Sequence, residues 1–131
     1  LYFQGKIEQD AMTMQPKFEN GLSKQIYDIL EKPSTTDLAT ELKKENIKVE
    51  DDMILLEVGH ALIEENKNDK ALILYKYYTQ SFPNIVVAWN DLGDTYLSKG
   101  NKEEAIKCYQ QALKIRPENP RAKQSLDKLK K

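Results

Sequence analysis

The stretch that decides the fold is residues 86–119, which read VVAWNDLGDTYLSKGNKEEAIKCYQQALKIRPEN. Trp89, Leu92 and Tyr96 follow one another at spacings of three and four residues, which places them on one side of a helix. Gly100 then interrupts the pattern, as a glycine does where a helix ends. The first part of the stretch therefore predicts one amphipathic helix that stops at Gly100.

A second helix is predicted after this break. Asn101 is a suitable N-cap, and Glu104 follows it at the spacing of a capping box. Pro117 ends the helix, and Gly93 in the first helix leaves room for the second to approach closely. The apolar residues of the second helix again lie three and four apart: Ala105, Cys108, Tyr109, Ala112 and Leu113. Residues 86–119 thus predict a helical hairpin.

The same pattern occurs a second time, 34 residues earlier in the chain. Residues 52–85 therefore predict a second hairpin. Because one such unit cannot bury its apolar face alone, the two hairpins are expected to stack. The pairs that fall on each other in this register are Leu55 with Trp89, Val58 with Leu92, Gly59 with Gly93, Leu62 with Tyr96, Ala71 with Ala105, Tyr75 with Tyr109, and Pro83 with Pro117.

These positions resemble the signature of the tetratricopeptide repeat. Residues 52–85 resemble it less closely and depart from it at Tyr78, where the family has a small alanine. The resemblance implies an all-α fold: a right-handed superhelical stack of antiparallel helix hairpins with about seven helices. The residues that carry the resemblance are Trp89, Leu92, Gly93, Tyr96, Ala105, Tyr109, Ala112 and Pro117 in the strong repeat, and Gly59, Ala71, Tyr75 and Pro83 in the degenerate one.

The flanks of the two repeats have separate roles. Residues 120–131 combine one apolar side with a basic side and predict the solvating helix that the end of a repeat array needs. Residues 17–50 lack the repeat signature but predict a helical pair that packs as a third layer. Residues 6–16 are a polar lead-in. Residues 1–5, Leu-Tyr-Phe-Gln-Gly, read as the remnant of a purification tag.

The resemblance also indicates where a ligand would bind. In such arrays the first helices of successive hairpins line a concave face. The residues expected to point outward from this face are Leu56, Glu57, His60, Ile63, Val87, Asn90, Asp91, Asp94, Leu97, Arg121 and Gln124. The alternative interpretation is that Asp91 and Asp94 are only solvated positions of an exposed helix.

The concave face lacks one well-known ligand site of the family. Chaperone co-factor members hold a C-terminal carboxylate with a clamp of two lysines, two asparagines and an arginine. Here Asn90 takes the place of a clamp lysine and Asp94 the place of an asparagine. A peptide that ends in a carboxylate would be repelled by Asp91 and Asp94.

Composition argues against several function classes. The chain of 131 residues has a formal net charge of −1, so a basic surface for nucleic acid is not expected. Cys108 and His60 are its only cysteine and histidine, too few for a metal site. No apolar run is long enough for membrane insertion. We expect a protein that is not an enzyme, with no cofactor, a protein or peptide partner, and possible homo-oligomers.

A looser resemblance offers a second function. The segments Val58-Gly59-His60-Ala61-Leu62-Ile63, Ser81-Phe82-Pro83-Asn84 and Asn90-Asp91-Leu92-Gly93 are similar to the C-terminal helical tails of some bacterial serine hydrolases, β-lactamase-like enzymes and esterases. This resemblance implies an accessory domain that packs on or orients a catalytic domain. Three hypotheses therefore remain. The first is a scaffold that binds a peptide or a partner helix on its concave face, the second is this accessory domain, and the third is a purely structural or self-assembling helical piece.

Overall fold

The computed structural model describes residue 18 and residues 21–130, and the lead-in and tag segments predicted at 6–16 and 1–5 lie outside them. The described residues form helices and no strand, so the predicted all-α fold is confirmed. In chain order the helices are α2 (Gly21–Glu31), α3 (Leu38–Lys44), α4 (Asp52–Glu64), α5 (Asn68–Ser81), α6 (Val86–Ser98), α7 (Lys102–Ile115) and α8 (Pro120–Lys130).

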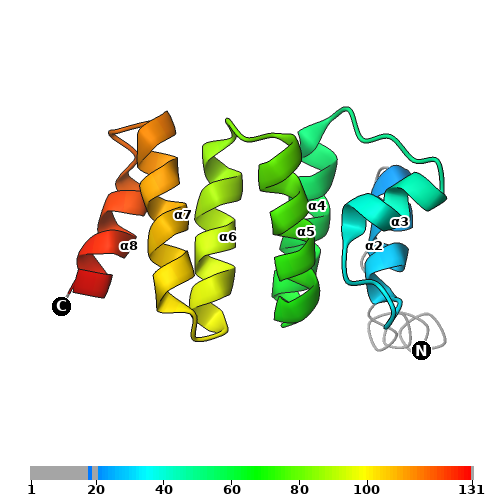
Figure 1. Ribbon diagram of the computed structural model, residues 1–131, viewed down its shortest axis with the longest axis horizontal. Coiled ribbons are helices and arrows are strands. Elements are labelled where there is room, and N and C mark those ends of the chain that lie inside the picture. Colours follow the sequence, from blue (N-terminus) through cyan, green and yellow to red (C-terminus); the bar gives the residue numbers. More distant parts are fainter. Residues whose placement is uncertain (1–17, 19–20, 131) are drawn as a thin grey trace, which may run out of the picture.

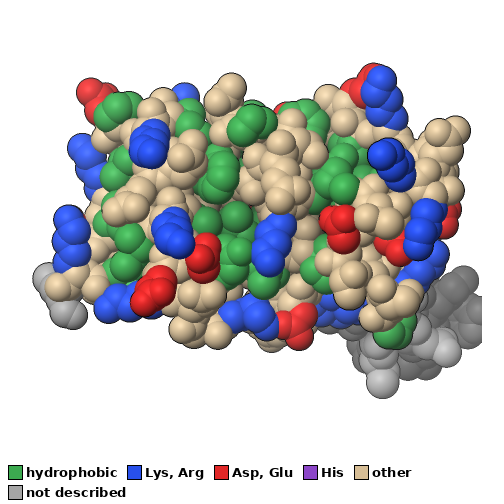
Figure 2. Space-filling model, in the orientation of Figure 1, with side chains coloured by type: hydrophobic (Ala, Val, Ile, Leu, Met, Phe, Trp, Pro, Cys, Tyr) green, Lys and Arg blue, Asp and Glu red, His purple; other side chains and the backbone are tan. Residues whose placement is uncertain are grey.

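The helices stand in a row, from α2 and α3 at one end to α8 at the other (Figure 1). From α4 to α8, each helix packs on the next one along the chain; α2 packs against α4 and α5, and α3 packs against α2 and α5. On the face shown in Figure 2, hydrophobic side chains gather over the middle helices, and basic side chains are spread across it. Burial in this fold therefore comes from contacts between neighbouring layers.

Three helices end in the same left-handed turn. Asn46 after α3, Asn66 after α4 and Gly100 after α6 have positive φ angles of 55°, 59° and 82°. After α6, the amide of Asn101 donates to the carbonyl of Tyr96 at 2.9 Å, which is the hydrogen bond of a Schellman motif. The predicted helix end at Gly100 is confirmed, and the two asparagines close the other helices in the same way.

We expect Gly100→Ala to lower the free energy of unfolding by about 1 kcal/mol, because an alanine Cβ is disfavoured in the left-handed region. A Cβ at this position would meet no heavy atom within 4 Å, so only the backbone contributes to the cost. Urea unfolding measures the loss. Gly21→Ala is the control, because Gly21 has equally open space in a helix. Equal losses in both variants would contradict the left-handed turn.

The tyrosine of each hairpin fits against a glycine of the facing helix. A Cβ on Gly59 would lie 2.5 Å from the hydroxyl oxygen of Tyr75, and a Cβ on Gly93 would lie 2.7 Å from the ring of Tyr109. Both tyrosines are buried. The glycine and tyrosine slots of the 34-residue pattern are thus one packing device, in which the missing side chain makes space for an aromatic ring.

Tyr78, the departure from the family pattern, is completely buried. Its hydroxyl donates to Asp52 at 2.7 Å, and its ring meets Phe82 edge to face at 6.2 Å between centroids. Burial, with the neighbouring Asp52 carboxylate, raises the pKa of this hydroxyl. The larger residue is therefore held by a hydrogen bond at its tip.

A polar network connects α2 to the turn between α4 and α5. Lys67 Nζ lies 2.5 Å from Glu31 Oε1 and donates to the Tyr27 hydroxyl at 2.7 Å. Tyr27 in turn donates to Glu65 at 2.6 Å. Burial raises the pKa of Glu31, but hydrogen bonds from Lys67 and Lys70 outweigh it and lower that pKa from 4.5 to about 2.

This network predicts a pH-dependent contribution to stability. A carboxyl whose pKa is lowered by folding stabilises the protein above its unfolded pKa and loses this effect as the pH falls. Because the Glu31 side chain is a third exposed, we expect the free energy of unfolding of wild type to exceed that of Glu31→Gln by only about 1 kcal/mol at neutral pH. The difference should shrink between about pH 5 and about pH 2. Glu103→Gln is the control, and a difference that does not change with pH would contradict the network.

Candidate interaction groove

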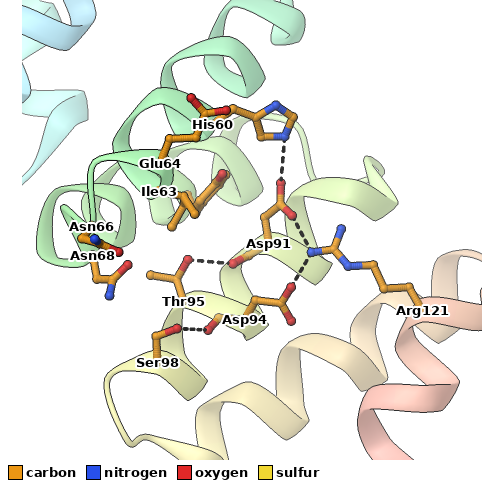
Figure 3. Close-up of a pocket in the computed structure, with 11 residues that line it drawn as sticks. His60, Ile63, Glu64, Asn66, Asn68, Asp91, Asp94, Thr95, Ser98 and Arg121 are labelled. Carbon is orange, nitrogen blue, oxygen red and sulfur yellow. Dashed lines mark hydrogen bonds and ion pairs between the residues drawn. The ribbon is translucent and has the colours of Figure 1, made fainter. Parts of the chain in front are cut away.

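A groove of about 340 Å³ lies between α4 and α6 and reaches the first turn of α8 (Figure 3). We call it the α4–α6 groove. Helix α4 contributes His60, Ile63 and Glu64; the following turn and α5 contribute Asn66, Asn68 and Tyr75; α6 contributes Asp91, Asp94, Thr95 and Ser98; and α8 contributes Arg121. The lining combines apolar surface with polar groups, as ligand pockets do.

The side chains from α6 share one side of the helix because of their spacing. Asp91, Asp94, Thr95 and Ser98 are three or four residues apart, which places them on one face. Thr95 donates its hydroxyl to the carbonyl of Asp91 at 2.8 Å, and Ser98 donates to that of Asp94 at 3.1 Å. Because the hydroxyl hydrogen of Ser98 is used within the helix and Ser98 is exposed, its oxygen remains available as an acceptor. Thr95 is only 1% exposed.

Arg121 connects α8 to this face of α6. It donates to Asp91 Oδ1 at 2.7 Å and to Asp94 Oδ2 at 2.5 Å. Burial alone would lower the pKa of Arg121, but the two carboxylates outweigh it and raise that pKa. The Tyr109 hydroxyl also donates to Asp94. One guanidinium therefore holds two carboxylates and fixes where α8 begins.

Asp91 has one oxygen that this network does not use. Its side chain is only 11% exposed, and its Oδ2 atom is buried without a hydrogen-bond partner among the described residues. His60 Nε2 lies 4.0 Å away, beyond hydrogen-bond distance. Burial, followed by the charge of Asp91, raises the pKa of the nearby Tyr75, so the tyrosine stays a neutral hydroxyl.

The groove has an acidic balance. Its lining holds three carboxylates, Glu64, Asp91 and Asp94, and one guanidinium, Arg121. With His60 neutral, its formal charge is −2. The guanidinium is already engaged by two of the carboxylates. The groove therefore favours cationic groups and disfavours anionic ones.

The structure brings four of the predicted site residues together in the groove, namely His60, Asp91, Asp94 and Arg121. Ile63, also expected to point outward, joins them and is 39% exposed. The interpretation of Asp91 as a merely solvated position is wrong, because its carboxylate is largely buried and paired with Arg121.

Six other predicted residues lie outside the groove. The outward placement of Asn90 is wrong: its side chain is 2% exposed and donates to Asn119 at 3.1 Å, at the start of α8. Leu56 packs against the core. Glu57 accepts a hydrogen bond from Ser23 of α2. The remaining three do not line the groove: Val87 is half-buried, and Leu97 and Gln124 are exposed.

Sequence reasoning missed several lining residues. Thr95 and Ser98 continue the spacing of Asp91 and Asp94, so the same helical stripe could have identified them. Asn66 lines the groove because its positive φ angle turns the chain at the end of α4. The signal for this turn is that Asn66 falls on Gly100 in the 34-residue register, because asparagine is the usual alternative to glycine where a helix ends in a left-handed residue.

The described residues offer neither a metal site nor a membrane span. Across residue 18 and residues 21–130, no three His, Cys, Asp or Glu side chains are grouped so that they could hold a metal ion. Within the same residues, no helix combines the length and the apolar character that crossing a bilayer requires.

Comparisons with known proteins agree with this architecture. Residues 86–119 match the family model of the tetratricopeptide repeat. The chain is 33% identical over 84 residues to the tetratricopeptide repeat domain-containing protein PYG7, chloroplastic, of Arabidopsis thaliana, covering 61% of this chain and 28% of that protein. It is 32% identical over 93 residues to the human protein O-mannosyl-transferase TMTC1, covering 71% of this chain and 10% of that protein.

A solved structure shares the fold. The crystal structure of MamA superimposes with a TM-score of 0.61 at 24% identity, over 82% of this chain and 62% of that one. At this level of identity, the likeness to MamA concerns the arrangement of the helices alone. The chain spans less than a third of the length of each of the two relatives above.

Proposed function

We propose, because this chain contains a tetratricopeptide repeat domain, that it is a protein-interaction scaffold whose α4–α6 groove binds a segment of a partner polypeptide. The observation that carries this proposal is the groove itself. Its lining comes from four helices and one turn, which are held in place by the packing of successive layers. A ligand would therefore meet a surface that is formed before it binds.

The lining suits a polypeptide segment. The exposed part of Ile63 offers apolar contact, and the hydroxyl oxygen of the exposed Ser98 offers an acceptor to backbone amides. The amides of Asn66 and Asn68 supply both donors and acceptors between the end of α4 and the start of α5. A segment laid along the groove can satisfy its backbone groups while it covers apolar surface.

A carboxylate-terminated tail is not the expected partner. Among the described residues, Arg121 is the only permanent cation that lines the groove, and the two carboxylates it contacts belong to the groove itself. A terminal carboxylate would compete for this guanidinium beside two negative charges. The second hypothesis, an accessory domain of a bacterial hydrolase, stays a prediction.

The test fills the groove. Random peptides displayed on phage are selected on the protein, and one selected peptide is synthesised with a fluorescent label. We expect Ser98→Trp, which places an indole in the groove, to weaken its binding at least about tenfold, a loss of about 1.4 kcal/mol. Ser81→Trp, at an exposed position at the end of α5, is the matched control.

The readout is fluorescence anisotropy, with circular dichroism to verify that both variants fold. Equal affinity of the peptide for wild type, Ser98→Trp and Ser81→Trp would show that the groove is not the binding site. Loss of binding in Ser81→Trp alone would place the site on another face.

A further inference from the structure

We infer that the α4–α6 groove anchors its partner through a lysine or arginine side chain, received among the carboxylates of Glu64, Asp91 and Asp94. This inference rests on the proposed function and specifies the chemistry of the partner. It is carried by two observations: the charge of the lining, and the Oδ2 atom of Asp91, which lacks a hydrogen bond among the described residues.

The first observation is the electrostatic balance of the groove. Arg121 engages Asp91 and Asp94 but leaves the lining with a formal charge of −2. Glu64 is exposed on α4 and makes no hydrogen bond or ion pair within the described residues. An ammonium or guanidinium entering from solvent is attracted, and a carboxylate or phosphate is repelled.

The second observation is Asp91 Oδ2. A buried carboxylate oxygen without a hydrogen bond is unfavourable, and this one has no partner among the described residues. His60 Nε2 is 4.0 Å away, and the His60 side chain is 60% exposed. An exposed imidazole can rotate away at little cost, so a cation of the partner can reach Asp91 in its place.

The groove also fits the uncharged part of such a side chain. The methylenes of lysine and arginine pack along apolar surface while the charged end stays among polar groups. Ile63 supplies that surface beside the carboxylates, and the hydroxyl oxygen of the exposed Ser98 is a further acceptor for the N–H donors of the cation. The pocket thus recognises both parts of the side chain.

The experiment begins with the phage selection described above. We expect the peptides whose binding is lost in Ser98→Trp to share a lysine or arginine at one position. A selected peptide is then synthesised with that residue and with norleucine. We expect norleucine to weaken binding to wild type at least about fivefold, as for the loss of a charge-assisted contact in a partly exposed site.

Glu64→Gln isolates the charge. Because Glu64 is exposed and its carboxylate makes no hydrogen bond or ion pair among the described residues, we expect this variant to bind the lysine peptide about threefold more weakly and the norleucine peptide as wild type does. Glu118→Gln removes an equally exposed charge outside the groove and should change neither affinity. His60→Lys places an ammonium group of the protein itself in the groove and should also weaken the binding of the lysine peptide.

The outcomes separate the two proposals. Groove-dependent peptides without a shared basic residue, or equal affinities for the lysine and norleucine peptides, would overturn the cation anchor and leave the proposed function intact. Peptides that bind equally to wild type and Ser98→Trp would overturn the proposed function, and the inference with it. Spermidine that binds more tightly than the lysine peptide would make a free polyamine the ligand and overturn the peptide anchor.

Discussion

Gly93→Leu is expected to lower the free energy of unfolding by roughly 3 kcal/mol, the upper part of the range for an overpacked core. A Cβ at Gly93 would already lie 2.7 Å from Cε1 of the Tyr109 ring. That ring cannot move aside easily, because it is completely buried and its hydroxyl donates to Asp94. The leucine must therefore push α6 away from α7.

Urea unfolding, monitored by circular dichroism, measures this loss. Gly93→Ala should also destabilise, although alanine favours a helix by about 1 kcal/mol over glycine, because the clash begins at Cβ. Gly21→Leu is the control, since a Cβ there meets nothing within 4 Å. If Gly93→Leu and wild type unfolded at the same urea concentration, the close approach of α6 and α7 would be refuted.

Asp91→Lys is expected to destabilise the protein by about 2 kcal/mol, a value below that of a fully buried pair because Arg121 is 41% exposed. The new ammonium would face the guanidinium of Arg121, and Asp94 alone would remain to hold the start of α8. This outcome differs from what a solvated, outward-facing aspartate would give, since reversal of such a charge leaves the fold unchanged.

The measurement is the thermal midpoint, which should fall by several degrees. Asp127→Lys reverses a charge on the exposed side of α8 and serves as control. Arg121→Met should lower the thermal midpoint by part of the same amount, because it leaves the largely buried Asp91 carboxylate without its cation. Identical midpoints for Asp91→Lys and Asp127→Lys would mean that the ion pair does not stabilise the junction of α6 and α8.

The hairpins can be predicted because their packing is written into a repeated pattern. Gly59 and Gly93 recur in one register, and so do Tyr75 and Tyr109, since each glycine accommodates the tyrosine of the facing helix. The burial of Asn90 cannot be predicted in this way. The helical wheel of α6 shows which residues α7 covers. Asn90 is instead buried by a third segment, because it donates a hydrogen bond to Asn119, the residue that precedes α8.

The sequence predicts the charges of the groove but not their pairing. His60, Asp91, Asp94 and Arg121 are all expected on one face, because their helices occupy equivalent positions in the stack. The contact of Arg121 with Asp91 spans 30 residues, and no local spacing reports such a contact. For the same reason the helical wheel places Glu57 on the concave face, whereas it accepts a hydrogen bond from Ser23 of α2.

The row of helices has a consequence for how fast the chain folds. Because most helices touch those that precede and follow them in the sequence, few contacts require distant parts of the chain to meet. Helical proteins with such local contacts fold in microseconds to milliseconds. In a stack of repeats, folding can begin at one interface between neighbouring hairpins and propagate to the next. The architecture therefore suits assembly by the addition of one hairpin to the next.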